Sequence, residues 1–251
     1  FKKLDIKGVK SADYIICISN FIRKRVKITY NRESYLHYIG VEIKRIKNKQ
    51  FDFNLRATLN LNPNSPILFS LGYSHHMKGA KELINIFHKI LFEVPESVLL
   101  IGGLIQKENK NDIEKSMIRL KIPKHKIIFY GYIENNLLDY FYSESTLTLY
   151  PAIDEPFGLI PLESMKNSTP VIAFREGGPS ETILEGRTGY LIKFNDLGDF
   201  AGKASMLIRN KKLYEEFSNN AIKHVEKNFS YDKCISDFEL ILEKLLFKKN
   251  F

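Results

Sequence analysis

The chain alternates short apolar runs with amphipathic stretches, and this alternation predicts its architecture. Each run has four or five residues, most of them apolar, and turn-forming or polar residues bound it. Runs of this length suit strands that are covered on both faces of a sheet. Six runs are predicted as strands: 14–18, 67–71, 98–101, 127–130, 147–150 and 171–174.

The stretches between these runs have helical spacing. Residues 81–92 place Leu83, Ile84, Phe87, Ile90 and Leu91 on one face. The same criterion predicts helices at 112–120, 136–142, 162–166 and 211–247, the last with a break at 229–231. Repeated strand–helix alternation predicts an α/β fold with a doubly wound, Rossmann-like parallel sheet. Ligands of such sheets bind beyond the carboxyl ends of the strands, so chemistry is expected in the loops that follow them.

The net charge is +9 and the pI is near 9.3. We interpret the basic residues, including the cluster Arg23–Lys27, first as a solvated surface, with contact to a membrane surface as the alternative. No nucleic-acid partner is predicted, because no nucleic-acid motif is present. No apolar run is long enough to span a membrane. Cys17 and Cys234 stand far apart in the sequence, which favours a reducing compartment. We therefore expect a cytoplasmic protein, or alternatively one that is peripheral to a membrane.

The segment 154–164, DEPFGLIPLES, carries the most specific chemistry. Glu155 follows the predicted strand 147–150, and Glu163 lies inside a helix whose first turn holds Pro161. The start of this helix offers free N–H groups and a partial positive charge to a diphosphate, and Gly158 allows the diphosphate to approach closely. A carboxylate in the first turns can accept hydrogen bonds from a ribose, and one in the preceding loop can reach a sugar.

This segment resembles the Glu-x7-Glu motif of the retaining GT-B glycosyltransferases of group 1, which are related to glycogen and sucrose synthases. The resemblance implies that Glu155 contacts the donor sugar, that Glu163 holds the ribose, and that the backbone of Phe157, Gly158 and Leu159 lies against the diphosphate. It spans residues 11 to 232, and also implies the C-terminal half of a GT-B fold.

Two further segments are similar to donor-binding loops of the same family. The segment 71–79, LGYSHHMKG, resembles its Gly-Arg…Lys-Gly loop, which implies that Lys78 pairs with the diphosphate. Tyr73 stands where the family has Arg, and His75 or His76 is a weak substitute for that charge. The segment 128–133, IFYGYI, resembles the one that frames the nucleobase. The resulting assignments are Glu155 and Lys78 as catalytic, with Gly72, Tyr73, His76, Gly131, Tyr132, Phe157, Gly158, Leu159 and Glu163 as donor-binding residues.

Three domains are expected. Residues 1–45 would be a remnant of an N-terminal acceptor domain with its linker, 46–228 the nucleotide-sugar-binding domain, and 229–251 a helix that packs back toward the N-terminal domain. The charged segment 44–54 reads as a linker.

The expected function is retaining transfer of a sugar from a nucleotide diphosphate sugar to an unknown sugar, lipid-linked or protein acceptor, without a cofactor or a metal. The 251 residues alone are expected to be inactive, because the acceptor side is largely missing. A non-catalytic sugar-nucleotide-binding or partner-binding domain is the main alternative. A sugar-nucleotide epimerase is disfavoured by the Glu-x7-Glu segment.

Overall fold

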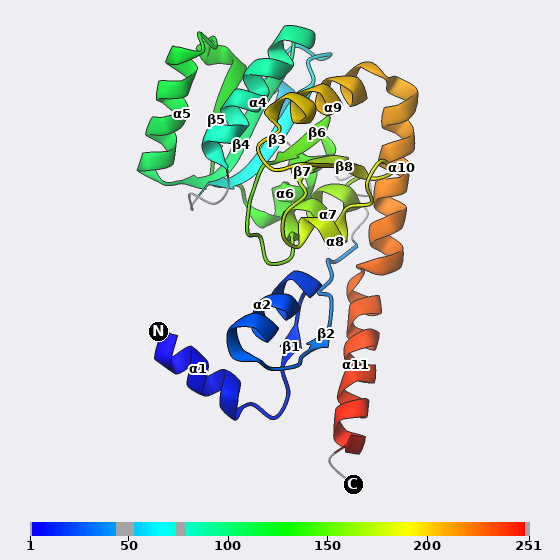
Figure 1. Ribbon diagram of the computed structural model, residues 1–251. Coiled ribbons are helices and arrows are strands. Elements are labelled where there is room, and N and C mark those ends of the chain that lie inside the picture. Colours follow the sequence, from blue (N-terminus) through cyan, green and yellow to red (C-terminus); the bar gives the residue numbers. More distant parts are fainter. Residues whose placement is uncertain (1, 44–52, 74–78, 249–251) are drawn as a thin grey trace.

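A six-stranded parallel sheet forms the centre of the protein (Figure 1). The computed structural model describes residues 2–43, 53–73 and 79–248. Strand order is β5-β4-β3-β6-β7-β8, and all five neighbouring pairs are parallel. The order runs outward in both directions from β3 and β6, as a doubly wound sheet requires. The strands are β3 Ile67–Tyr73, β4 Val98–Ile105, β5 Ile127–Gly131, β6 Leu147–Tyr150, β7 Val171–Phe174 and β8 Gly189–Ile192.

Helices cover both faces of this sheet, which confirms the predicted fold class. One face is covered by α4, α5 and α9, and the other by α3, α6, α7 and α10. The helices are α3 Leu55–Thr58, α4 Ala80–Glu93, α5 Lys107–Arg119, α6 Asn135–Ser143, α7 Leu159–Lys166, α8 Pro179–Thr182, α9 Leu197–Arg209 and α10 Lys211–Asn228. A 3₁₀ turn at Lys124–Lys126 precedes β5.

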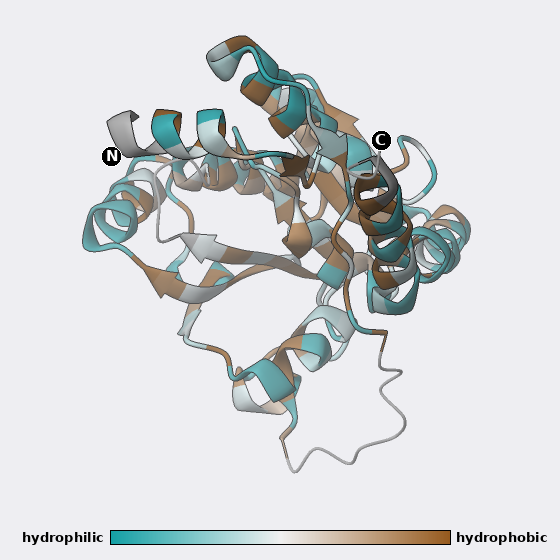
Figure 2. Ribbon diagram, turned by 90° about the horizontal axis from the view of Figure 1, so that it is seen from below, coloured by the Kyte–Doolittle hydropathy of each residue, from teal (hydrophilic) through white to brown (hydrophobic). Residues whose placement is uncertain are grey.

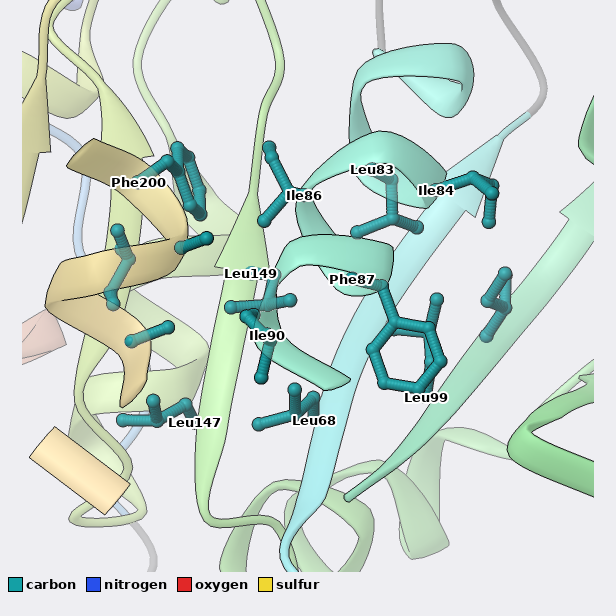
Figure 3. Close-up of a cluster of buried hydrophobic side chains, with 14 of the residues drawn as sticks. Leu68, Leu83, Ile84, Ile86, Phe87, Ile90, Leu99, Leu147, Leu149 and Phe200 are labelled. Atoms are coloured by element: carbon teal, nitrogen blue, oxygen red, sulfur yellow. The ribbon is translucent and has the colours of Figure 1, made fainter. Parts of the chain in front are cut away.

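The largest core cluster lies beneath α4 (Figure 3). Leu83, Phe87 and Ile90 of α4 are fully buried and pack against Leu68 of β3 and Leu149 of β6. In β3 the neighbours Ile67 and Phe69 point to the other face and join the cluster under α6. The continuous apolar runs therefore arise because each strand buries both of its faces.

The first 43 residues form a smaller unit. It consists of α1 Lys2–Ser11, β1 Ile16–Cys17, α2 Asn20–Tyr30 and β2 Tyr35–Leu36, with β1 and β2 paired in parallel. The strand predicted at 14–18 is therefore only two residues long in its ladder. Figure 1 shows this unit below α7 and α8, with α2 facing them.

The chain returns to this small unit through its last two helices. As predicted, the helical stretch breaks near 229–231: α10 ends at Asn228 and α11 Tyr231–Lys248 begins after the break. At the break, Val41 N–H donates to the Phe229 carbonyl and Tyr231 N–H donates to the Val41 carbonyl. The rings of His37 and Phe238 lie 4.8 Å apart between centroids. Figure 2, coloured by hydropathy, shows that α11 contains hydrophobic as well as hydrophilic residues.

Several elements differ from the prediction. The helix predicted at 112–120 begins earlier, at Lys107. The prediction missed this start because the first residues of the helix, KEN, are polar and show no apolar periodicity. Both β8 and α9 were absent from the predicted elements. The linker segment 44–54 lies mostly outside the described residues. Within the described part of the chain, no helix is both long and apolar enough to cross a bilayer.

Candidate functional site

The loop after β6 carries Glu155 at the carboxyl edge of the sheet. Its carboxylate accepts a hydrogen bond of 2.8 Å from the hydroxyl of Tyr150, the last residue of β6. The preceding residue, Asp154, has a left-handed backbone (φ 55°) and pairs with Arg25 of α2 at 2.6 Å. Glu155 is thus held from the strand side, and its neighbour from the smaller N-terminal unit.

The same loop leads into the N-terminus of α7. Gly158 is the N-cap, with φ 95°, and Pro161 stands in the first turn as predicted. Phe157 is 2% exposed, and its ring packs on Tyr38 with centroids 5.9 Å apart. The side chain of Phe157 therefore belongs to the core and is not available to a ligand. Leu159 is 39% exposed at the helix tip.

A second helix N-terminus lies beside this loop. Gly79 is the N-cap of α4, with φ 72°. A Cβ atom on Gly79 would lie 2.1 Å from the carbonyl oxygen of Pro151, just after β6. Only glycine allows this approach, which brings the start of α4 against the loop that carries Glu155. The predicted contacts Lys78, His75 and His76 fall outside the described residues, and Tyr73 is the last residue of β3.

Glu163 lies in the second turn of α7, in contact with a buried tyrosine. The Tyr142 hydroxyl donates to its carboxylate at 3.2 Å. Burial raises the pKa of the Glu163 carboxyl, although Tyr142 and Lys166 act in the opposite direction. The pKa of Tyr142 is raised mainly by burial, then by Glu163, and also by Tyr150, the partner of Glu155. Each carboxylate thus accepts a hydrogen bond from a tyrosine, Glu163 from Tyr142 and Glu155 from Tyr150.

The remaining predicted residues lie at the ends of neighbouring strands. Gly72 is the residue before the last of β3, and Gly131 ends β5; both have positive φ. Tyr132, next in the chain, is 66% exposed, and Leu104, near the end of β4, is 70% exposed. An exposed aromatic ring and an exposed aliphatic side chain therefore border the edge where β4 and β5 end.

A contact that the sequence did not indicate joins α8 to α2. Glu181 of α8 accepts hydrogen bonds from the backbone N–H groups of Asn20 and Phe21 at 2.8 and 2.9 Å. It also accepts from the Asn20 amide and the Tyr38 hydroxyl. Burial, followed by contact with Glu181, raises the pKa of Tyr38 to about 12. These partners are far apart in the chain, so no local spacing could have revealed them.

The arrangement favours binding of an anion with hydroxyl-bearing groups on either side. Two helix N-termini offer N–H groups that have no acceptor within their helices. Two carboxylates stand nearby as hydrogen-bond acceptors. In the part of the chain that the structure describes, no group of three His, Cys, Asp or Glu side chains is placed to hold a metal ion.

Comparison with known proteins gives a consistent result. The model of the family described as glycosyl transferases group 1 matches residues 51–224. N-acetyl-alpha-D-glucosaminyl L-malate synthase of Bacillus anthracis is 25% identical over 249 residues, which cover 95% of this chain and 61% of that protein. The capsular polysaccharide biosynthesis glycosyltransferase CapM of Staphylococcus aureus is 26% identical over 85% of this chain and 54% of its own length. The chain thus spans about half to two thirds of these relatives.

The fold is shared with solved structures. The crystal structure of Anabaena HepE in complex with UDP and glucose superposes with a TM-score of 0.86 over 96% of this chain and 66% of HepE. Its sequence identity is 18%, so this likeness concerns the fold. The Rossmann-like sheet is therefore of the kind found in GT-B glycosyltransferases.

Proposed function

Because this chain belongs to the group 1 glycosyltransferases, we propose that it supplies the donor half of a site for retaining sugar transfer from a nucleotide diphosphate sugar. The observation that carries the proposal is that the loop holding Glu155 packs against the N-cap of α4 at its start and leads into the N-cap of α7 at its end. Gly79 caps α4 against Pro151, and Gly158 caps α7 a few residues further along.

The diphosphate would lie between these two helix ends. Each N-terminus contributes about half a positive charge and unpaired N–H donors. Lys78, immediately before Gly79 in the sequence, would add a full charge. Such preorganised positive potential stabilises the diphosphate as it departs, so the proposed reaction requires neither a metal nor a cofactor.

The carboxylates would position the groups on either side of the diphosphate. We assign the ribose hydroxyls to Glu163, because its second carboxylate oxygen is not used in the bond from Tyr142. We assign the donor sugar to Glu155, which Tyr150 orients. Glu155 is not assigned the role of a covalent nucleophile. Tyr132, Gly131 and Gly72 would frame the nucleobase end of the donor.

Retention of configuration and a relation to sucrose synthases rest on the resemblance of the Glu155–Glu163 segment to its family motif. The acceptor is proposed to be a sugar, a lipid-linked group or a protein group, and a relative named for capsular polysaccharide biosynthesis favours the first of these. The expected inactivity of these 251 residues alone stays a prediction, as do the domain boundaries, the cytoplasmic location and a membrane contact.

One observation favours a second candidate, a domain that binds a sugar nucleotide or a protein partner without catalysis. Tyr73 stands where the family loop carries Arg. The site then lacks one cation for the departing diphosphate, and Tyr73 can offer only a neutral hydroxyl there. Binding would survive this change better than turnover.

Thermal unfolding with UDP-glucose, GDP-mannose and ADP-glucose tests the donor site. A ligand at a hundred times its Kd stabilises the folded state by about 2.7 kcal/mol, which raises Tm by about 5–10 °C in a protein of this size. We expect one of the three to do so. Glu163→Ala should abolish the shift, whereas Glu216→Ala, at an exposed position of α10, should keep it. No shift with any nucleotide sugar would refute the donor-site proposal.

A further inference from the structure

Most of the positive charge of the protein lies in its first 32 residues. They hold nine Lys or Arg and two Asp, a net charge of +7. The other 219 residues hold 29 Lys or Arg and 27 Asp or Glu, a net charge of +2. The interpretation of the basic residues as an evenly solvated surface is therefore incomplete, because the charge is concentrated on α1 and α2.

Within this region the cations line a hollow along α2. Its volume is about 270 Å³. Asn20, Arg23, Lys24 and Lys27 recur at the spacing of one helix face, and Arg32, Glu33 and Ser34 form the opposite wall. Four cations thus face one hollow that contains a single carboxylate.

Two of the cations are held in place by the protein. The Arg32 guanidinium donates to the carbonyl oxygens of Val9, Lys10 and Ala12 at 2.7–3.0 Å, which fixes it at the end of α1. Arg23 donates to the Asn20 side chain at 3.1 Å. Neither guanidinium is neutralised by a carboxylate in these contacts. Their positions are set before any ligand arrives, which lowers the entropic cost of binding.

The other two cations are exposed and differ in their surroundings. Lys27 pairs with Glu33, which offsets one charge. Lys24 has no ion-pair partner among the described residues. Cations gathered in one hollow repel one another, and an anion there would relieve that repulsion. A phosphate group, with a charge near −2 and three acceptor oxygens, matches a set of Arg and Lys donors.

One end of the hollow adjoins the loop that carries Glu155. Asn20, which lines the hollow, is bonded to Glu181. Ser19, one residue earlier, donates to the carbonyl of Pro156 at 2.6 Å, and Pro156 directly follows Glu155 in the chain. A molecule anchored along α2 by a phosphate could therefore extend past the start of the helix toward the donor sugar.

We propose that this hollow binds a phosphate group and that the phosphate belongs to the acceptor of the sugar. The second half of the statement rests on the proposed function, whereas the first half does not. The phosphate can be the monoester of a soluble metabolite or the diester of a lipid headgroup, since both present anionic phosphate oxygens to the cations. In this proposal Arg23, Lys24 and Arg32 contact the phosphate, and Lys27 leaves its ion pair with Glu33 to contact the phosphate as well.

The test compares two charge-removal variants. The α2 variant removes three charges that face the hollow: Arg23→Gln/Lys24→Gln/Lys27→Gln. The α10 variant removes three exposed charges elsewhere: Lys212→Gln/Lys223→Gln/Lys227→Gln. Circular dichroism checks that both variants fold. Binding of sn-glycerol 1-phosphate is measured by calorimetry with UDP in excess, so that the diphosphate site is occupied. Sedimentation with phosphatidylcholine vesicles, with and without phosphatidylglycerol, measures binding to a lipid phosphate.

We expect the α2 variant to weaken binding of one probe by roughly tenfold or more, and the α10 variant to leave it unchanged. If the α2 variant loses binding of glycerol phosphate, the ligand is a soluble phosphate. If it loses binding only of the anionic vesicles, the ligand is a lipid. Equal binding by both variants, or binding of neither probe by the wild type, overturns the proposal. UDP binding is measured in parallel. If the wild type binds phosphate at α2 but binds no nucleotide, the phosphate site stands, and the assignment of that phosphate to a sugar acceptor is refuted.

Discussion

The Ser19 hydroxyl donates a hydrogen bond of 2.6 Å to the carbonyl oxygen of Pro156, across 137 positions of sequence. The same oxygen of Ser19 accepts the N–H of Ile22 and so begins α2. On the opposite side of the loop, Gly178 N–H donates to the carbonyl of Glu155 at 2.8 Å. The loop that holds Glu155 is thus fixed between the start of α2 and the start of α8.

Glu181→Ala tests whether α8 and α2 hold this loop together. The change leaves the N–H groups of Asn20 and Phe21 and the Tyr38 hydroxyl without their acceptor, at the positive end of α2. We expect a loss of about 1–2 kcal/mol in the free energy of unfolding, measured by urea titration. Nucleotide-sugar affinity should fall as well. Glu216→Ala, at an exposed position, is the control, and an equal effect of both would show that the contact is unimportant.

Glu163→Gln tests the effect of burying a carboxyl group. Burial raises the folded-state pKa of Glu163 above its ordinary value of 4.5. The protonated group is therefore favoured by folding. Its stabilising contribution is complete below pH 4.5 and is lost as the pH rises through the folded-state pKa. We expect the stability of the Gln variant relative to the wild type to rise as the pH increases above 4.5, and to level off once the pH exceeds the folded-state pKa of Glu163. A stability difference that does not change with pH would contradict the assigned shift.

Nucleotide affinity of the same variant gives a second outcome. The Glu163 carboxyl has two oxygens, one of which accepts from Tyr142, whereas Gln keeps only one carbonyl oxygen for both Tyr142 and the ribose. We expect Glu163→Gln to bind the preferred nucleotide more weakly, by roughly tenfold, while its stability is retained or raised. Weaker binding combined with higher stability would separate a ligand contact from a structural role. Calorimetric titration with the nucleotide measures it.

Gly79→Ala tests the approach of α4 to the β6 loop. The new Cβ would lie 2.1 Å from the Pro151 carbonyl oxygen, and the backbone at this position has φ 72°. We expect a loss of about 2–4 kcal/mol in unfolding free energy and loss of nucleotide binding. Gly202→Ala in α9 is the matched control, because nothing lies within 4 Å of its added Cβ and its φ is helical. That variant should gain about 0.5–1 kcal/mol.

Tyr73→Arg restores the charge that the family loop carries. We expect tighter binding of UDP, by roughly tenfold, because a guanidinium can bond the diphosphate in two places. The gain should shrink as salt is added. Tyr73→Gln, which adds a polar group without a charge, should show no such gain. Weaker binding of the Arg variant would mean that this position does not face the diphosphate.

The sequence by itself determined the type of sheet and the order in which its elements occur. Apolar runs such as 67–71 and 171–174 became strands buried on both faces, and the 3.6-residue spacing of Leu83, Phe87 and Ile90 became α4. These signals are local, since each depends on residues a few positions apart. The segment from Glu155 to Glu163 also placed its loop and helix correctly, because Gly158 and Pro161 mark a helix start.

The tertiary structure alone decided which groups meet. Phe157 lies in the core against Tyr38, Glu163 meets Tyr142, and Glu181 closes the start of α2, and each pair joins segments 21 or more positions apart. The cations of the first 32 residues line a common hollow because Arg32 is bonded to carbonyl oxygens at the end of α1. Such contacts depend on how strands are ordered and how helices cross, and that geometry leaves no periodic trace along the chain.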